Sequence, residues 1–310
     1  MSDADPNELL LDELLKTLDC HWAALPDKPE ETASNSVRAL WLRARGDPQS
    51  VRRARQAPLP VLELEDVRRL RELIDRRHTG VPLAHLTGRQ NFLGLELEAG
   101  PEALVPRQET EILATAALGL LHGLVLERGA ARVLDLCAGA GNLATTLAHY
   151  EPGCQVWAAD LSPDALQLAR RNAERHQLEN RVRFLAGDLF APFAGEEFHH
   201  CFDLIVCNPP YISTAKVGEL PAETGQHEPR LAFDGGAFGL SVIGRLIQES
   251  PRYLKPASWL CFELGRGQGD YLARSLEKNP AYAEVRRLLD NRSEVRALAA
   301  RTRTEFSGNP

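Results

Sequence analysis

The chain has 310 residues, of which 44% are hydrophobic and 25% are charged, so it is long enough for one large or two ordinary globular domains. A net charge of -7 disfavours direct nucleic-acid binding, because such domains usually carry a basic face, and the basic runs at 51–55 and 69–77 are interpreted as solvated helix faces. The six scattered cysteines predict no metal site. An acidic start and the lack of an apolar run of membrane-spanning length predict a cytoplasmic protein.

Apolar residues recur at helical spacing over 9–18 and again over 61–74. The proline-containing segment 58–60 separates the two patterns, and nothing between them alternates as a strand would. The sequence therefore predicts a small N-terminal helical domain over residues 1–90. Such a domain offers a docking surface for a partner.

Residues 95–98 alternate between apolar and polar side chains, which predicts a short strand or hairpin in a linker over 91–110. A helix is expected over 110–126, and strands and helices then alternate through a catalytic domain over 111–310. The expected strands are 132–136, 155–159, 182–186, 203–207 and 259–264. The expected helices between and after them are 142–149, 163–177, 240–254 and 268–278. This alternation predicts a mostly parallel sheet with helices on both faces, and ligands bind such sheets at the carboxyl ends of the strands.

The first expected strand ends in the turn Cys137-Ala138-Gly139-Ala140-Gly141, which opens a helix. Glycine lets the backbone approach a ligand closely, and a helix start favours a carboxylate or phosphate. A turn of this kind is weak evidence by itself. NAD remains a competing ligand on this feature, because Ala144 is a tolerated variant at the third position of the dinucleotide fingerprint.

The next two expected strands end in acidic residues. Asp160 can accept hydrogen bonds from both hydroxyls of a ribose, because Ser162 is the better cap for the following helix. Asp188 can accept from an adenine amino group, and Leu189 can pack on the ring. Together with the glycine-containing turn, these strand ends predict an adenosine-containing ligand.

The fourth expected strand ends in Asn208-Pro209-Pro210-Tyr211. Prolines fix φ and lack N–H groups, so the backbone here offers carbonyl acceptors only. Asn208 adds a side-chain carbonyl, and Tyr211 adds a flat face for stacking. These groups suit a planar substrate with an NH₂ group, whose nitrogen they can aim at a methyl donor. This centre favours methyl transfer over NAD chemistry.

Residues 208–211 resemble the NPPY motif of amino methyltransferases, a group that acts on DNA adenine, RNA guanine and protein glutamine. Most of residues 65–270 resemble one branch of that group, the protein N5-glutamine methyltransferases. The further segments that carry this resemblance are 82–88, 104–111, 227–230 and 234–236.

The resemblance implies an α/β fold: a seven-stranded, Rossmann-like sheet that binds S-adenosyl-L-methionine, with a small N-terminal helical domain. It implies methylation of a protein glutamine and no metal. The residues implied in cofactor binding are Asp135, Cys137, Ala138, Gly139, Ala140, Gly141, Asp160, Leu161, Asp188, Leu189 and Asn208. The residues implied in catalysis, which would hold the substrate glutamine, are Asn208, Pro209, Pro210 and Tyr211.

Two substrates are implied by different segments. Residues 106–111 resemble the enzymes that methylate the Gly-Gly-Gln loop of peptide chain release factors, whereas Cys137 resembles the enzymes that act on ribosomal protein uL3. Phe238 and the tail after Asp290 depart from the family pattern. We expect a release factor to be the substrate, with uL3 as the second candidate. A nucleic-acid base and a small amide or guanidine stay open as alternatives, and a non-catalytic binding module is disfavoured because Asn208 is retained.

Overall fold

The computed structural model describes residues 6–19 and 28–305, and the chain divides into two compact units. The first unit comprises Met1–Pro101 together with Pro221–Glu228, and the second comprises Glu102–Leu220 together with Pro229–Pro310. The chain therefore leaves the second unit and returns to it, which the sequence did not indicate. Cys20 lies outside the described residues, and the described cysteines are free thiols.

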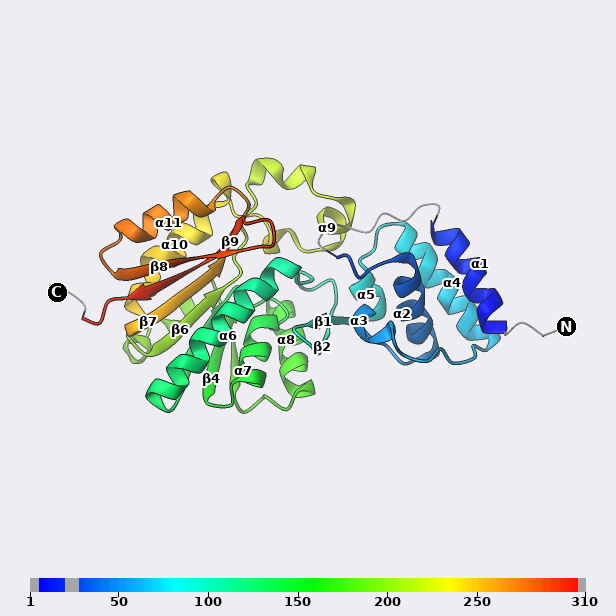
Figure 1. Ribbon diagram of the computed structural model, residues 1–310, viewed down its shortest axis with the longest axis horizontal. Coiled ribbons are helices and arrows are strands. Elements are labelled where there is room, and N and C mark those ends of the chain that lie inside the picture. Colours follow the sequence, from blue (N-terminus) through cyan, green and yellow to red (C-terminus); the bar gives the residue numbers. More distant parts are fainter. Residues whose placement is uncertain (1–5, 20–27, 306–310) are drawn as a thin grey trace. The chain divides into compact units, whose positions relative to one another are not determined.

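The first unit is helical, as predicted, with one short hairpin (Figure 1). Trp41 and Leu40 of its second helix and Leu70 of its fourth are fully buried and centre its core. The hairpin strands pair antiparallel, with Phe92 opposite Leu95. The elements are α1 (Pro6–Asp19), α2 (Ala33–Arg45), α3 (Val51–Ala54), α4 (Leu64–His78), α5 (Leu83–Thr87), β1 (Arg89–Phe92), β2 (Leu95–Glu98) and α9 (Ala222–His227).

The second unit contains a seven-stranded sheet with the order β5-β4-β3-β6-β7-β9-β8. Neighbouring strands from β5 to β7 run parallel, and β9 runs antiparallel to both β7 and β8. The strands are β3 (Ala131–Leu136), β4 (Cys154–Asp160), β5 (Val182–Ala186), β6 (Phe202–Cys207), β7 (Leu254–Glu263), β8 (Tyr282–Leu289) and β9 (Val295–Thr302). The helices are α6 (Gln108–Arg128), α7 (Asn142–Tyr150), α8 (Pro163–Arg175), α10 (Ser241–Glu249) and α11 (Gly269–Lys278). The predicted Rossmann-like sheet is confirmed.

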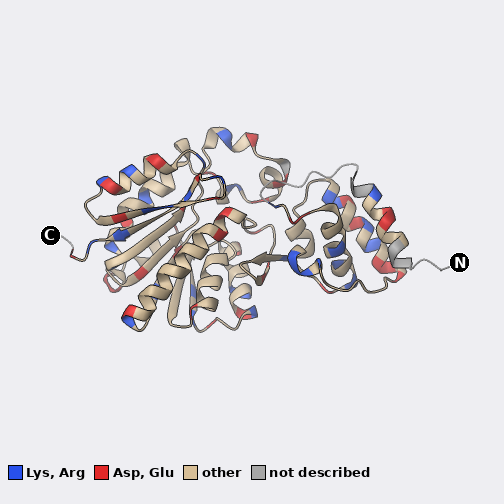
Figure 2. Cartoon of the chain, in the orientation of Figure 1, with Lys and Arg blue, Asp and Glu red and all other residues tan. Residues whose placement is uncertain are grey.

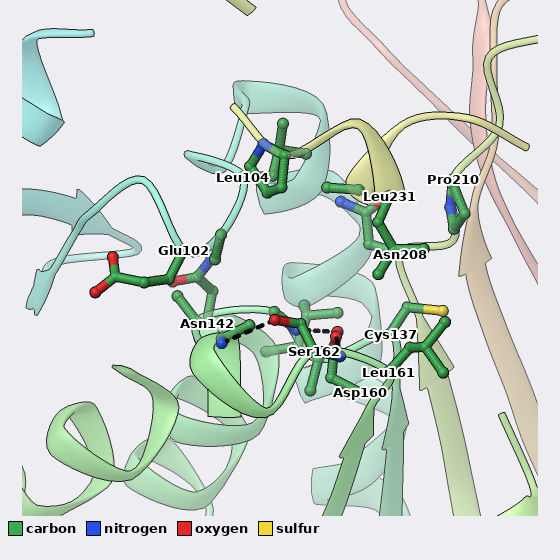
Figure 3. A pocket seen from close by; sticks show the side chains of 18 of the residues that line it. Glu102, Leu104, Cys137, Asn142, Asp160, Leu161, Ser162, Asn208, Pro210 and Leu231 are labelled. Carbon is green, nitrogen blue, oxygen red and sulfur yellow. Dashed lines mark hydrogen bonds between the residues drawn. The ribbon is translucent and has the colours of Figure 1, made fainter. Parts of the chain in front are cut away.

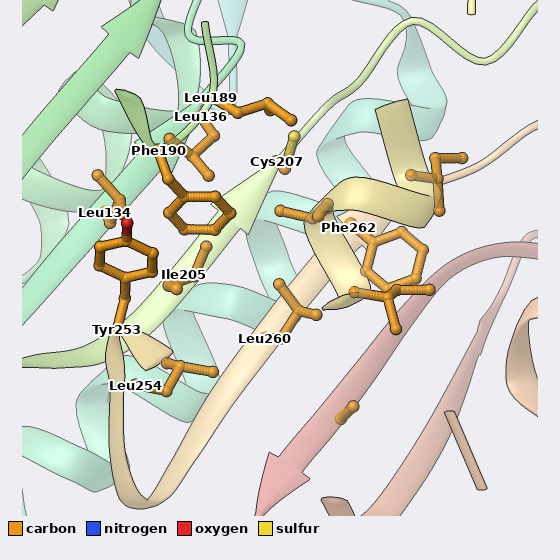
Figure 4. Packing of buried hydrophobic residues seen from close by; sticks show 14 of the residues in the cluster. Leu134, Leu136, Leu189, Phe190, Ile205, Cys207, Tyr253, Leu254, Leu260 and Phe262 are labelled. Carbon is orange, nitrogen blue, oxygen red and sulfur yellow. The ribbon is translucent and has the colours of Figure 1, made fainter. Parts of the chain in front are cut away.

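Helices cover both faces of this sheet. α6, α7 and α8 lie along one face, and α10 and α11 lie along the other (Figure 1). Alternate residues of β3, such as Leu134 and Leu136, point to the face of α10 and α11, because side chains alternate along a strand. There they pack with Phe190, Ile205 and other buried side chains (Figure 4). This core fixes the strand ends that carry the site.

Most expected boundaries in the second unit lie within two residues of the observed ones, but two are wrong by about a helical turn or more. The helix expected over 240–254 ends at Glu249, and a 3₁₀ turn follows over Ser250–Arg252. Pro251 explains this early end, because proline has no N–H to continue the helical ladder. The strand expected over 259–264 starts earlier, at Leu254.

The expectation about apolar runs is wrong for α6. Its 21 residues are long and apolar enough to cross a membrane by length and composition alone. In the structure, however, α6 lies along the sheet, and Leu113, Ala117 and Leu121 are fully buried. Only 33% of the apolar window is buried, so packing on the sheet explains part of the apolar composition of α6.

Candidate functional site

A cavity of about 220 Å³ lies at the carboxyl ends of the parallel strands (Figure 3). β3 is the switch point of the sheet, because the chain runs outward to β4 and β5 on one side and to β6 on the other. Ligands bind at such a point in open α/β sheets. The cavity is lined by the segments that follow β3, β4, β5 and β6. Residues of the segments 102–110 and 229–234 line it as well.

The turn after β3 has the strained backbone that its glycines suggest. Gly139 has a φ of 53° and Gly141 a φ of 75°, and Cys137 also adopts a left-handed conformation with a φ of 56°. A side chain at Gly141 would meet Ala169 of α8 at 2.9 Å. The turn therefore depends on glycine both for its conformation and for close packing.

Most residues predicted to bind the cofactor are brought together in this cavity. Those that line it are Cys137, Ala138, Gly139, Ala140, Asp160, Leu161, Asp188, Leu189 and Asn208. Asp135 and Gly141 are not among the lining residues. Gly141 is turned toward α8, and Asp135 is fully buried beneath the turn, where its Oδ2 accepts from the N–H of Ala144 at 2.9 Å. Burial raises the pKa of Asp135 to about 8, and the hydrogen bond from the Ala144 N–H opposes that shift, so this side chain supports the turn from below.

Asp160 connects two turns at the edge of the cavity. Its Oδ2 accepts from the N–H of Gly139 at 2.8 Å, and its Oδ1 accepts from the N–H of Ser162 at 2.8 Å. Ser162 caps α8, as predicted, because its hydroxyl accepts from the N–H of Ala165. Burial raises the pKa of Asp160, and the hydrogen bonds from Ser162 and Gly139 oppose that shift. Each oxygen keeps a further lone pair, so the carboxylate can still accept from a ligand.

The acidic residue after β5 is more exposed. Asp188 forms an ion pair with Arg245 of α10 at 2.7 Å, and about half of each side chain is exposed. Leu189 is buried and has a φ of 48°. The cavity therefore has one apolar wall and one charged edge at this strand end.

Only half of the predicted catalytic motif reaches the cavity. Asn208 and Pro210 line it, whereas Pro209 and Tyr211 do not. Tyr211 packs against the hydrophobic core, and its hydroxyl donates to Glu263 at 2.9 Å. Burial and the Glu263 carboxylate raise the pKa of Tyr211 well above its usual value. The predicted stacking face of Tyr211 is thus used in packing.

The backbone of this motif is held by a glycine-rich segment. A side chain at Gly235 would meet the Pro210 carbonyl oxygen at 2.4 Å, and one at Gly239 would meet the Tyr211 carbonyl oxygen at 1.9 Å. Gln268 also donates from Nε2 to the Tyr211 carbonyl at 3.1 Å. Glycine is required here because two backbone segments approach each other closely.

The sequence reasoning missed several residues of the site. Glu102, Leu104 and Thr110 line the cavity from the segment before and at the start of α6. Asn142 and Leu231 line it as well. Leu104 and Thr110 carry a signal in the sequence, because both lie in 104–111, a segment that resembles the linker of the glutamine methyltransferases, whereas Glu102 lies outside it.

Comparisons with known proteins agree with this geometry. The family model described as "Methyltransferase small domain" matches residues 114–223. The release factor glutamine methyltransferase of Geobacter sulfurreducens is 41% identical over 209 residues, which are 67% of this chain and 69% of that protein. The chain belongs to the glutamine methyltransferase family. Another member, the ribosomal protein uL3 glutamine methyltransferase of Bradyrhizobium diazoefficiens, is 38% identical over 64% of this chain and 62% of its own length.

A solved structure shows the same fold. It is the hMettl16 catalytic domain in complex with MAT2A 3′UTR hairpin 6, with a TM-score of 0.52 over 77% of this chain and 84% of that chain. At 16% identity this likeness shows the fold alone. For the glutamine methyltransferase family the methyl donor is S-adenosylmethionine, and the cavity fits it. The acidic residue at the end of β4, Asp160, suits the ribose, and the apolar side chains of Leu161 and Leu189 suit the adenine. The glycine-containing turn after β3 lets the backbone approach the rest of such a ligand closely.

Proposed function

We propose that this glutamine methyltransferase methylates the side-chain amide nitrogen of a glutamine in the Gly-Gly-Gln loop of a translation release factor. One observation carries the proposal. Asn208 and Pro210, which follow β6, line the same cavity as the turns that follow β3, β4 and β5. A site for an adenosine-containing methyl donor and a set of acceptors for an amide are thus adjacent.

The residues of the three turns would hold different parts of the cofactor. Asp160 would accept from the ribose hydroxyls, Leu161 and Leu189 would pack on the adenine, and Asp188 would accept from its amino group; all four line the cavity. The turn from Cys137 to Ala140, which also lines the cavity, would hold the remainder of the ligand. S-adenosylmethionine, when bound, supplies an electrophilic methyl group.

Asn208 and Pro210, the two residues of the motif that line the cavity, are assigned to orienting the substrate, through the Asn208 side-chain carbonyl and a backbone carbonyl. An amide nitrogen is a weak nucleophile because its lone pair is delocalised, so its direction matters more than the strength of a base. Two acceptors for its two N–H bonds fix that direction. Orientation of this kind lowers a barrier by on the order of 7–11 kcal/mol. The proton can leave after the nitrogen has become cationic, which removes the need for a strong base.

The net charge of -7 favours a protein substrate over nucleic acid. Arginines are interspersed with Asp and Glu along α4 (Figure 2). There Arg68 and Arg69 both pair with Glu65, and Arg71 pairs with Glu13 of α1. The shorter helices α2 and α3, in contrast, carry arginine and no acidic residue.

Ribosomal protein uL3 is the second candidate substrate. The uL3 enzyme of Bradyrhizobium diazoefficiens is 38% identical, and Cys137 in the cofactor turn resembles that branch. Both candidate substrates belong to the translation machinery, which supports a cytoplasmic location. We assign docking of the protein substrate to the helical unit, which comprises Met1–Pro101 and Pro221–Glu228.

Intact-mass analysis of a release factor incubated with the protein and S-adenosylmethionine tests the proposal. We expect a gain of one methyl, which peptide mapping places on the Gly-Gly-Gln glutamine. Asn208→Ala should reduce turnover at least a hundredfold and keep the dissociation constant of the cofactor within a few-fold, since Asn208 mainly orients the substrate.

The control is the same release factor with its loop glutamine replaced by alanine, which should gain no mass. Methylation of uL3 and not of the release factor would move the assignment to the second substrate. Binding of the cofactor without methylation of either protein would overturn both assignments.

A further inference from the structure

Glu263 is a buried carboxylate beside the catalytic motif. It ends β7, which pairs in parallel with β6 so that Cys207 lies opposite Phe262. Glu263 therefore lies level with Asn208, the next residue along β6. Its side chain is fully buried. Its Oε1 accepts from the Tyr211 hydroxyl at 2.9 Å, its Oε2 has no hydrogen-bond partner among the described residues, and the Thr110 hydroxyl is close enough to lower the pKa of Glu263. Such a group is costly to bury and is retained where it has polar partners.

Thr110 connects Glu263 to Asn208. The side-chain Nδ2 of Asn208 donates to the Thr110 hydroxyl oxygen at 3.2 Å. A hydroxyl has one proton to donate, and an ionised carboxylate can only accept. The oxygen of Thr110 accepts from the NH₂ group of Asn208, so its proton is available to Glu263, whose buried Oε2 has no other hydrogen-bond partner among the described residues. This order of donors leaves the carbonyl oxygen of Asn208 as the acceptor that a ligand can use.

We propose that Glu263 is a positioning residue for methyl transfer, because it fixes the Asn208 amide through Thr110 and holds the Tyr211 side chain directly. This inference rests on the proposed function. If the Asn208 amide were turned over, its NH₂ group would face the NH₂ group of the substrate, and two donors cannot pair. Glu263 thus acts on the reaction through the direction of one hydrogen bond.

The charge of Glu263 depends on the groups around it. Burial raises the pKa of Glu263 to about 7, hydrogen bonds from Thr110 and Tyr211 lower it, Arg296 of β9 lowers it and Glu109 of α6 raises it. Arg296 and Glu109 also pair with each other at 3.4 Å. When Glu263 is protonated it can itself donate, so it no longer dictates the direction of the Thr110 hydroxyl. We therefore expect turnover to rise with pH through neutrality in the wild-type enzyme.

A double-mutant cycle on turnover tests this chain of contacts. Glu263→Gln and Thr110→Val should each lower kcat roughly 10- to 100-fold, while the dissociation constant of S-adenosylmethionine stays within about threefold. Thr110→Ser, which retains the hydroxyl, should recover most of the activity. The double variant should be no more than about threefold slower than the slower single variant, because both changes interrupt one chain. Glu127→Gln, an exposed residue of α6, is the matched control.

The pH profile separates positioning from a loss of stability. In Glu263→Gln the rise in kcat near neutrality should disappear, although the variant is folded by circular dichroism. Two results would overturn the inference and leave the proposed function in place. One is a double variant whose loss of kcat equals the product of the two single losses, and the other is a Glu263→Gln enzyme whose kcat still rises with pH as in the wild type. A wild-type enzyme that binds the cofactor and methylates no protein glutamine would overturn the proposed function, and the role of Glu263 with it.

Discussion

At the scale of single residues, Asp160 has a structural role in addition to the ligand-binding role proposed for it. Its two carboxylate oxygens already hold the N–H groups of Gly139 and Ser162, so it joins the turn after β3 to the start of α8. A residue that orders two loops around a cavity reduces the entropy that a ligand must lose on binding. Asp160 is thus proposed to serve both as a ligand and as a support for the turn.

Replacement of Asp160 by alanine should weaken the binding of S-adenosylmethionine. We expect a loss of roughly 1.5–3 kcal/mol, the range for hydrogen bonds to a charged group, with a further loss from the released Gly139 turn. Isothermal titration calorimetry measures the change. Asp164→Ala removes the same charge from an exposed position nearby in α8 and should leave the affinity within about twofold. Equal affinities of the two variants would contradict the ribose assignment.

The site residues that could be predicted from the sequence are those whose role is indicated by their immediate neighbours in the chain. Asn208 stands before two prolines, and Asp160 ends a strand directly before a cap. Thr110 and Glu263 could not be found in this way. Each acts on the motif from another element, Thr110 from a position 98 residues before Asn208, and only the sheet and α6 bring them together.

At the scale of elements, the segment after the catalytic motif requires particular residues, as the motif itself does. Gly235 and Gly239 let this segment lie directly against the carbonyls of Pro210 and Tyr211. Gly239 has a φ of 68°, where an L residue is strained in any case. The position of Asn208 therefore depends on the absence of side chains from an adjacent loop.

Gly239→Ala should displace the motif and lower turnover at least tenfold. Its Cβ would stand 1.9 Å from the Tyr211 carbonyl oxygen, so one backbone segment must move. Gly244→Ala is the matched control, because Gly244 lies in α10 with nothing within 4 Å of an added Cβ. In a helix that change should stabilise by about 0.5–1 kcal/mol and leave turnover unchanged. Turnover assays and urea denaturation distinguish these results, and wild-type turnover of Gly239→Ala would refute the dependence.

Helices and parallel strands of the second unit could be predicted because each has a clear period and a turn at its end. β8 and β9 could not. β9 lies within the tail after Asp290 that departs from the family pattern, and its buried run Arg296 to Ala300 lacks the alternation of a strand with one solvent-exposed face. Its place between β7 and β8 explains the pattern, because a central strand is covered on both faces.

At the scale of the whole molecule, two separate segments of the chain contribute to the helical unit. After the catalytic motif it leaves the second unit, contributes Pro221–Glu228 to the first and returns at Pro229, which lines the cavity. Inside the helical unit, Glu223 of this visiting segment forms a buried ion pair with Lys28 and another with Arg77 at 2.7 Å. Arg77 also pairs with the buried Glu31 at 3.2 Å. Two cations and two carboxylates thus compensate one another within the helical unit.

Glu223→Gln should destabilise the helical unit by about 3 kcal/mol or more, because it leaves two buried cations with a single carboxylate. Glu13→Gln is the control, since its pair with Arg71 is about half exposed and should be worth at most about 1 kcal/mol. Hydrogen exchange should show faster exchange in α4 and α9 of Glu223→Gln, with the strands of the second unit unchanged.

The effect of pH on this cluster has a definite sign. Burial alone would raise the pKa of Glu223, but Lys28 and Arg77 outweigh it and hold that pKa below its usual value. A carboxylate whose folded pKa is depressed contributes stability that is present above its unfolded pKa and is lost as pH falls through its folded pKa. The difference in protection between the wild type and Glu223→Gln should therefore be largest near neutrality and shrink below pH of about 4.5, the ordinary pKa of glutamate. A difference that grew as the pH fell would show that Glu223 is neutral in the folded protein and that the cations find their compensation elsewhere.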